Sequence, residues 1–230
     1  GIQGGQVDEV VYGMVVPAGQ GQIPGRQASV KGGIPHEVPV VTINKVCGSA
    51  LKAVTLGAQM IKAGDADIIV AGGMESMSNI PYVLENMRWG ARMNDVKAKD
   101  AMVLDGLWCP ENDVHMAVIG GQVASEYNVT REMQDAWSLR SQKLWAEGEA
   151  QGKFDDERFV VEVPAQKGQT IIFDKDEAPR PGTTMKGLAK LPPLFVKDGT
   201  VTAGNAPGTN DGASAIVIMS REKAEELGAP

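Results

Sequence analysis

Residues 38–73 read VPVVTINKVCGSALKAVTLGAQMIKAGDADIIVAGG, and this stretch carries two kinds of periodicity. It opens on a run of β-formers at 38–43, and a continuous apolar run follows at 68–71. Between them, residues 48–63 have the composition of a helix, with Gly64 as the expected stop after its last turn. A strand–helix–strand order with wholly apolar strands is typical of a covered parallel sheet. The stretch therefore predicts an α/β fold built in layers.

The helix expected at 48–63 is apolar on more than one side. One face carries Leu51, Val54, Ala58 and Ile61. The other side is almost as apolar, with Ala50, Ala53, Leu56, Gly57 and Met60. A helix that is apolar nearly all round belongs in the interior of a protein, so we expect this one to be buried on nearly every side.

Cys47 stands where the first strand should turn into this helix, with the small residues Gly48 and Ser49 directly behind it. A thiol at a helix N-terminus faces unpaired backbone N–H groups and the positive end of the helix dipole. Both favour the thiolate, which is the nucleophilic form. The alternative interpretation is a small buried apolar side chain, which is the usual environment of a free cysteine.

The composition excludes several classes of protein. The chain has 230 residues and a net charge of −7, so a general electrostatic footprint for nucleic acid is not expected. Its two cysteines cannot form a disulfide framework, and a reducing compartment, the cytoplasm, fits best. No apolar run is long enough to cross a bilayer. The chain begins at Gly1 without a methionine, so we expect it to be part of a longer protein.

Alternation of strand and helix begins before the opening stretch and resumes near the end of the chain. Residues 10–16 and 213–219 read as strands, 25–31 as a short helix, and a further helix starts near Ser220. The intervening residues 79–199 break the alternation, so we interpret them as an insertion between two strands of one α/β domain.

The insertion has its own predicted elements. One helix is expected at 114–127 with Asp113 as its N-cap, and a second at 131–147 behind Thr130. Met133, Trp137 and Leu144 form an apolar stripe on the second helix, which we expect to face a core. Two strands are expected at 159–163 and 170–173.

A second informative stretch, GTVTAGNAPGTNDGASAIVIMS at 199–220, combines four glycines with turn-forming Asn and Asp residues before an apolar strand. With it, four blocks follow one another along the chain: the surroundings of Cys47, AGGMESMS at 71–78, His115-Met116, and TVTAGNAPGTNDGA at 200–213. In this order and over nearly the whole chain, the sequence resembles the thiolases, the acetyl-CoA acetyltransferase family.

The resemblance implies a layered α/β/α domain, incomplete at both ends, with a long inserted α+β loop domain. The domain would comprise residues 1–78 and 200–230, without the family's first strand and helix. Residues 79–199 would form the loop domain that covers coenzyme A (CoA). In thiolases the cysteine that matches Cys47 accepts the acyl group of a first CoA thioester, and its backbone N–H helps to form an oxyanion hole. The implied reaction joins two acetyl-CoA molecules into acetoacetyl-CoA, or reverses that step, with CoA thioesters as substrates, no permanently bound cofactor and no metal.

The resemblance also implies which residues contact CoA. Arg180 and Phe195 match positions at the nucleotide end of CoA, and His115 and Met116 match a pair at the acyl pocket of short-chain thiolases. Local charge agrees, because residues 178–197 carry four cations and no acid in an acidic chain. Many biosynthetic thiolases have a serine where this chain has Pro207, which has no donor. Contacts there are therefore expected from Ala203, Gly204 and Ala206.

Two catalytic groups of the family have no match in this sequence, namely the histidine that activates the nucleophile and a second, proton-transferring cysteine. Cys109 lies in the insertion and is interpreted as structural. We therefore expect the chain to be the N-terminal part of a longer enzyme and to be inactive alone. The family also implies a dimer or tetramer. Residues 82–107 match the region that joins dimers, and their Tyr, Leu, Met and Trp side chains either form that interface or pack internally.

Other functions fit less well. A degradative 3-ketoacyl-CoA thiolase is the main alternative within the family. CGSA at 47–50 partly matches the surroundings of a papain-type cysteine, but Ala50 replaces a cysteine and the only later histidine, His115, is too close. A third alternative is a non-catalytic, thiolase-like binding module. The presence of Cys47 disfavours this alternative, because a binding module needs no nucleophile.

Overall fold

A computed structural model describes residues 1–229, apart from the side chain of Lys167, and divides them into two units. Unit 1 comprises residues 1–108 and 209–229, and unit 2 comprises residues 109–208. The segment 79–108, assigned to the insertion on sequence, thus groups by its contacts with the sheet of unit 1.

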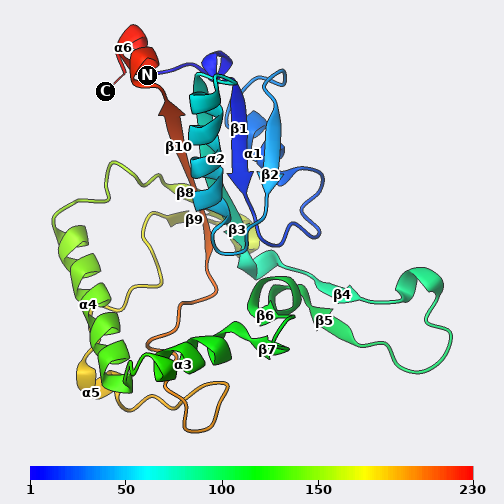
Figure 1. The fold of residues 1–230 in the computed structure, drawn as a ribbon, viewed down its shortest axis with the longest axis vertical. Coiled ribbons are helices and arrows are strands. Elements are labelled where there is room, and N and C mark those ends of the chain that lie inside the picture. The colour runs from blue at the N-terminus through cyan, green and yellow to red at the C-terminus, as the bar shows by residue number, and fades with distance from the viewer. Residues whose placement is uncertain (230) are drawn as a thin grey trace. The chain divides into compact units, whose positions relative to one another are not determined.

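Unit 1 is built on a four-stranded mixed sheet in the order β10–β3–β1–β2 (Figure 1). Its strands are β1 (Glu9–Gly13), β2 (Val40–Ile43), β3 (Ile68–Ser76) and β10 (Asp211–Met219). The first three are parallel, as their apolar runs predict, and β10 is antiparallel to β3. Strand β3 extends beyond its expected end because its second half pairs with β10, where Ser76 lies opposite Asp211.

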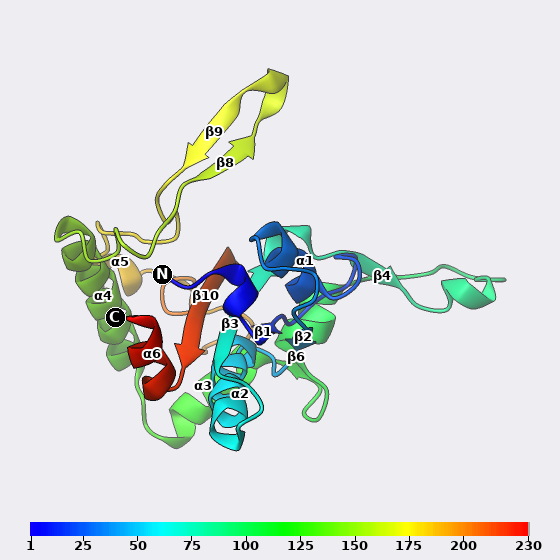
Figure 2. The same cartoon turned by 90° about the horizontal axis from the view of Figure 1, so that it is seen from above.

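Two helices cover opposite faces of this sheet, because alternate strand residues point to opposite sides. On one face Val10, Tyr12 and Ile68 form a buried cluster, and α1 (Pro24–Lys31) lies against Tyr12. On the other face Val11 and Ile69 pack against α2 (Ser49–Ala63). Figure 2 shows α1 and α2 on opposite sides of the strands. The layered α/β/α arrangement expected from the sequence is confirmed.

Helix α2 ends as predicted but is less buried than predicted. Gly64 follows its last residue in the left-handed conformation that a helix stop requires. Only one stripe, including Ala53 and Gly57, is buried, whereas the Leu51 side chain is 69% exposed. The expectation of burial on nearly every side is therefore wrong for the chain as described, because α2 has a sheet on one side and no second layer on the other.

The remaining elements of unit 1 are short. A hairpin of β4 (Tyr82–Leu84) and β5 (Ala98–Asp100) extends away from the sheet (Figure 1). Its large apolar side chains, at Tyr82, Leu84, Met87, Trp89 and Met93, are exposed. The other elements are η1 (Gly4–Gln6), η2 (Met77–Asn79), η3 (Met87–Trp89), the π-helix η4 (Met102–Leu107) and α6 (Arg221–Leu227), while β6 (Trp108–Cys109) crosses the boundary between the units.

Unit 2 contains three helices and a β-hairpin. The helices are α3 (Met116–Glu126), α4 (Arg131–Ala150) and α5 (Met185–Leu188). The hairpin pairs β8 (Val161–Pro164) with β9 (Thr170–Phe173), joined through η5 (Gln166–Gly168), and it stands away from α4 (Figure 2). The short strand β7 (Val114–His115) precedes α3.

The predicted N-cap of α3 is wrong. The helix begins at Met116, and His115 caps it by accepting the Ala117 N–H at Nδ1, 3.1 Å away. Asp113 has a φ of +52°, which differs from the extended backbone that an N-cap adopts. Thr130 does cap α4 as predicted, because its side chain accepts the Met133 N–H at 3.3 Å.

The apolar stripe of α4 points outward rather than into a core, which corrects the sequence expectation. Met133, Trp137 and Leu144 are exposed, Trp137 by 65%. The side of α4 that packs within unit 2 is instead mostly polar. It carries Arg131, Asp135 and Gln142 in hydrogen bonds, and Trp145 stacked with Phe154. The helix is therefore held by polar contacts that hydrophobic periodicity does not reveal.

Candidate active site

The turn between β2 and α2 carries Cys47, as predicted. Strand β2 ends at Ile43 and the helix begins at Ser49, which leaves Cys47 two residues before the first helical turn. Its thiol is free and exposed. The residue before it, Val46, has a φ of +48°, an unfavourable conformation for a β-branched residue. Such local strain persists only where surrounding contacts impose it, and it is common at functional sites.

Two side chains impose this conformation. The Asn44 amide donates from Nδ2 to the Val15 carbonyl at 2.8 Å, and its Oδ1 accepts the Val46 N–H at 2.8 Å. The Ser49 hydroxyl accepts the Lys45 N–H at 2.8 Å and donates to the Val46 carbonyl at 2.6 Å. The peptide groups on both sides of Val46 are therefore held by side chains within four residues of it.

Glycines let the first turn of α2 approach the ends of the central strands. A Cβ added at Gly13 would lie 2.5 Å from the backbone N of Ala50. A Cβ added at Gly73 would lie 2.7 Å from the Ala50 Cβ. Both distances are shorter than real contacts, so only glycine allows α2 to lie this close to β1 and β3. The glycines thereby determine how close the start of α2, and with it Cys47, lies to the ends of β1 and β3.

A mostly apolar pocket of about 440 Å³ lies in front of Cys47 within unit 1. Its walls come from the ends of β1 and β3, from the segment 102–107 and from the start of β10. Residues that supply its apolar surface include Val46, Met74, Met77, Ile80, Met102 and Leu107. The one carboxylate in its wall, Glu75, is engaged with the backbone N–H groups of Val15 and Val16, at 2.7 and 3.2 Å. The exposed thiol thus borders an apolar pocket of the size that binds small molecules.

Backbone donors also lie at this site. The N–H of Gly48 donates to the Lys45 carbonyl at 3.1 Å, and that of Ser49 donates to the Val46 carbonyl at 3.0 Å. Among the hydrogen bonds found in residues 1–229, none is donated by the Cys47 N–H. This N–H lies just before the start of α2, where the helix dipole favours negative charge.

Two titratable groups stabilise the sheet beside the pocket. The Asp211 carboxylate at the start of β10 accepts the Ser78 N–H at 2.9 Å, and this hydrogen bond lowers the pKa of Asp211. The Tyr12 hydroxyl donates to the Ser214 carbonyl at 2.9 Å, and burial raises the pKa of Tyr12. Both bonds tie β10 to elements far away in the sequence.

Within unit 2 the fold brings together two of the predicted CoA residues. The rings of His115 and Phe195 are stacked, with centroids 4.3 Å apart and planes 18° apart. Because Nδ1 of His115 accepts a backbone N–H, neutral His115 carries its proton on Nε2. The neighbouring Met116 side chain is 47% exposed at the start of α3.

Arg180 lies elsewhere in unit 2, on an exposed loop. Its guanidinium Nη1 donates to the carbonyls of Glu177, Ala178 and Pro179, at 2.8, 3.3 and 3.3 Å. Its backbone N–H donates to Oε1 of Gln142 on α4 at 2.6 Å. No hydrogen bond or ion pair joins it to His115 or Phe195 within the described part of the chain.

The predicted residues Ala203, Gly204 and Ala206 form a tight turn at 202–206. The Thr202 hydroxyl accepts the Gly204 N–H at 3.2 Å, and the Thr202 carbonyl accepts the N–H groups of Asn205 and Ala206 at 3.2 and 3.0 Å. Ala203 is exposed at the crest of this turn. Pro207 follows on the exposed side.

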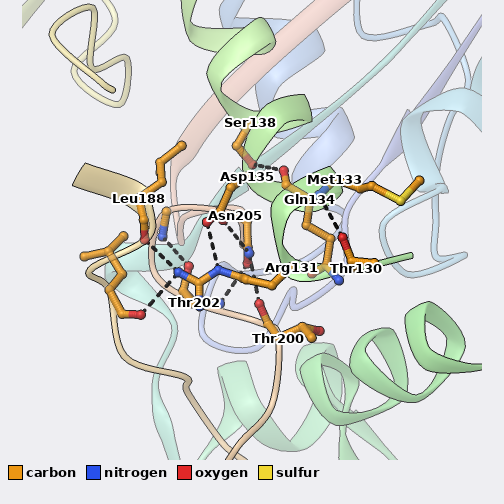
Figure 3. Close-up of polar contacts among 12 residues, drawn as sticks. Thr130, Arg131, Met133, Gln134, Asp135, Ser138, Leu188, Thr200, Thr202 and Asn205 are labelled. Atoms are coloured by element: carbon orange, nitrogen blue, oxygen red, sulfur yellow. Dashed lines mark hydrogen bonds and ion pairs between the residues drawn. The ribbon is translucent and has the colours of Figure 1, made fainter. Parts of the chain in front are cut away.

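Sequence reasoning missed the residues that hold these sites in place. Ser49 acts within its own turn, where its contacts with Lys45 and Val46 have no periodic signal. Asn44, Gly13 and Gly73 act through contacts with another element. In unit 2 the missed group is Arg131, Asp135 and Asn205, which are joined by hydrogen bonds (Figure 3). The i,i+4 spacing of Arg131 and Asp135 indicates an ion pair, but not that it is buried.

The described residues contain neither a metal-binding cluster nor a membrane-spanning helix. No group of three or more His, Cys, Asp or Glu side chains in residues 1–229 is arranged to hold a metal ion. No helix in that range has the length and apolar character needed to cross a membrane.

Comparisons with known proteins agree with one another. The family described as thiolase, N-terminal domain, matches residues 1–222. An acetyl-CoA acetyltransferase of Pseudomonas aeruginosa is 52% identical over 230 residues, which cover 100% of this chain and 58% of the relative. The solved structure of an acetyl-CoA acetyltransferase from Syntrophomonas wolfei matches with a TM-score of 0.93 at 40% identity, covering 100% of this chain and 57% of that one. The Bacillus anthracis enzyme matches with a TM-score of 0.94 at 36% identity, covering 100% and 58%. The chain thus spans somewhat over half the length of these relatives.

Proposed function

Because the chain belongs to the thiolase family, we propose that the protein it is part of transfers acyl groups between CoA thioesters through an acyl-cysteine at Cys47. The observation that carries this proposal is the free thiol of Cys47, exposed at the start of α2 and facing an apolar pocket. The favoured reaction is the condensation of two acetyl-CoA molecules to acetoacetyl-CoA, and its reversal.

The first half of the reaction uses groups of this chain. The Cys47 thiolate attacks the thioester carbonyl carbon, a new S–C bond forms, and the bond to the CoA sulfur breaks. The CoA thiolate leaves and takes up a proton. The negative charge that develops on the carbonyl oxygen is stabilised by the unengaged Cys47 N–H at the helix N-terminus. The acyl-enzyme is itself a thioester, so little bond energy is lost.

The second half requires groups that this chain lacks. A base removes a proton from the methyl carbon of the second acetyl-CoA, and the resulting carbanion attacks the acyl carbon and releases the Cys47 thiolate. We propose that this base is a second cysteine. We assign it, and the histidine that activates Cys47, to the part of the enzyme beyond this chain. We therefore expect residues 1–230 alone not to form acetoacetyl-CoA.

Unit 2 supplies the proposed CoA contacts. Arg180 would contact the nucleotide end together with Phe195, while His115 and Met116 would line the acyl end. The turn of Ala203, Gly204 and Ala206 would support the pantetheine arm, with Pro207 offering only apolar contact. The stacked His115–Phe195 pair and the exposed crest at Ala203 support this proposal.

Further assignments follow from the same proposal. Residues 1–78 and 200–230 would form the thiolase domain, and residues 79–199 the loop domain that covers CoA. The exposed apolar side chains of the β4–β5 hairpin would pair dimers into a tetramer. The enzyme would work in the cytoplasm on acyl-CoA metabolism, including fatty acids, where both cysteines stay reduced.

The decisive experiment is mass spectrometry of the full-length enzyme quenched during turnover with acetyl-CoA. We expect an acetyl group on the peptide that contains Cys47, and loss of condensation in Cys47→Ala. Cys109→Ala, which removes the other thiol of this chain, is the matched control and should keep activity. Acetylation at another residue, or synthesis by Cys47→Ala, would refute the proposal. A series of acyl chain lengths separates short-chain condensation from the degradative alternative, which predicts a preference for longer 3-ketoacyl-CoA.

A further inference from the structure

The most buried side chains of unit 2 are mainly polar. Thr202 and Asp135 are 0% and 2% exposed, and Leu188 is the only buried large apolar residue among residues 109–208 of the described chain. A charged side chain buried this deeply requires partners for all its acceptors. Each carboxylate oxygen of Asp135 accepts a hydrogen bond, and one of the two donors, Asn205, lies in the turn at 202–206.

Asp135 joins three segments that are far apart in the sequence (Figure 3). Its Oδ2 accepts from Nε of Arg131 at 2.8 Å, and its Oδ1 accepts from Nδ2 of Asn205 at 3.1 Å. Nη2 of Arg131 in turn donates to the carbonyls of Leu188, the last residue of α5, and of Leu191 beyond it, at 2.6 and 3.2 Å. The start of α4, the end of α5 and the turn are thus tied together through the ion pair of Arg131 with the buried Asp135.

Asn205 transmits this contact into the turn. Its Oδ1 accepts the Thr202 N–H at 2.7 Å, and its Nδ2 also donates to the Thr200 carbonyl at 3.0 Å. Gly204 lies close against the end of α5 and the segment after it, because a Cβ there would be 2.5 Å from Leu188 Cδ2 and 2.6 Å from Leu191 Cδ1. The turn therefore has a fixed inner side, and Ala203 is its exposed outer residue.

A buried ion pair contributes little stability over an apolar replacement of the same shape, and in several proteins it instead determines how its neighbours pack. The turn at 202–206 is closed by its own hydrogen bonds to Thr202, and the contact of Asn205 with Asp135 fixes the turn to α4.

We propose that Asp135 is a positioning residue for substrate binding, which holds the turn at 202–206 in the conformation that receives the CoA thioester. This inference rests on the proposed function, in which Ala203, Gly204 and Ala206 contact the substrate. Asp135 itself acts through Asn205 and touches no substrate.

The test is Asp135→Asn in the full-length enzyme. Asparagine keeps the shape but has one acceptor, so either Arg131 or Asn205 loses its partner. We expect the KM for acetyl-CoA to rise roughly tenfold, which corresponds to one lost hydrogen bond to a charged group, while kcat changes little. Amide hydrogen exchange at Gly204, Asn205 and Ala206 should become faster, while the rate at which iodoacetamide alkylates Cys47 in unit 1 should not change.

Two further variants keep the test decisive. Asp155→Asn is the matched control, since Asp155 pairs with Arg158 in the same unit at 2.9 Å but is 69% exposed; it should leave KM and exchange unchanged. Asn205→Ala leaves the ion pair intact but removes the link to Asp135 together with the bonds of Asn205 to Thr202 and Thr200. It should raise KM at least as much as Asp135→Asn does, and it should do so even if Asp135→Asn folds poorly.

The outcomes separate this inference from the proposed function. Unchanged KM and exchange in Asp135→Asn and Asn205→Ala would overturn the positioning role. Faster exchange with an unchanged KM would show that the turn is held but does not serve binding, which also overturns it. If the wild-type enzyme showed no saturable use of acetyl-CoA, the proposed function would fail, and the exchange rates alone would decide whether Asp135 holds the turn.

Discussion

Asn44 lies directly before the turn that carries Cys47, and its side-chain amide donates to the carbonyl of Val15, 29 residues earlier, at 2.8 Å. The same side chain accepts the Val46 N–H at 2.8 Å. One asparagine thus connects the segment after β1 to the strained residue beside the proposed nucleophile. The conformation of the turn therefore depends on the segment that follows β1 as well as on the local sequence.

Replacing Asn44 by alanine should disturb this turn more than the rest of the fold. Loss of both hydrogen bonds should lower the free energy of unfolding by about 1–2 kcal/mol. Acylation of Cys47 by acetyl-CoA should slow by roughly tenfold or more, because the sulfur is no longer held in position. Denaturant titration and rapid-quench acylation measure the two effects. The control is Asn79→Ala, since the amide of the exposed Asn79 donates at 2.8 Å to the Ser76 hydroxyl in the same unit. Equal acylation rates in both variants would contradict the role given to Asn44.

The strain at Val46 predicts a stabilising substitution. Glycine adopts a φ of +48° without penalty, so Val46→Gly should raise the free energy of unfolding by up to about 1 kcal/mol despite the added freedom of the unfolded chain. Val41→Gly is the comparison, because Val41 lies in β2 and glycine in a strand is destabilising. Thermal or denaturant unfolding gives the sign directly. A Val46→Gly variant that is less stable than the wild type would show that strain is absent there.

Gly13 should tolerate no side chain. In Gly13→Ala the new Cβ would meet the Ala50 backbone at 2.5 Å, so α2 must move away from the sheet. We expect a loss of about 1–3 kcal/mol in unfolding free energy, which is typical of overpacking, together with slower alkylation of Cys47. At Gly5 a Cβ would only reach the Pro35 side chain at 4.0 Å, so Gly5→Ala should be nearly neutral. Equal stability of the two variants would contradict the close approach of α2.

The hydrogen bond from Ser78 to Asp211 predicts a pH dependence. This bond lowers the pKa of Asp211 in the folded state below its unfolded value of about 3.9. A carboxylate with a lowered pKa stabilises the fold at pH values above the unfolded pKa, and this contribution disappears as the pH falls through the folded pKa. Asp211→Asn should therefore be less stable than the wild type at pH 7, and the difference should shrink below about pH 4. Unfolding titrations at pH 7 and pH 3 measure it, and a difference independent of pH would argue against the bond. Because Asp211 is exposed, we expect a small effect.

Local signals in the sequence were sufficient for the strand–helix alternation of β1, β2, α2 and β3, for Gly64 at the end of α2, for Thr130 at the start of α4 and for the place of Cys47. Each depends on residues within one or two turns of one another, so a single sequence contains all the information. The predicted cap of α3 failed because Asp113 and His115 compete within three residues, and the backbone conformation that decides between them is set by the rest of the unit.

The inward face of α4, the burial of Asp135 and the stacking of His115 on Phe195 could not be read from local pattern. These features depend on groups that lie 57 to 80 residues apart, such as Arg131 with Leu188, Asp135 with Asn205, and His115 with Phe195. An apolar stripe of the kind at Met133, Trp137 and Leu144 shows which residues are able to be buried, but not which neighbour is available to cover them. Periodicity and capping are encoded within a few residues, whereas partners for buried polar groups exist only once distant segments have been brought together, and the hydrogen bonds they form then decide which conformation persists.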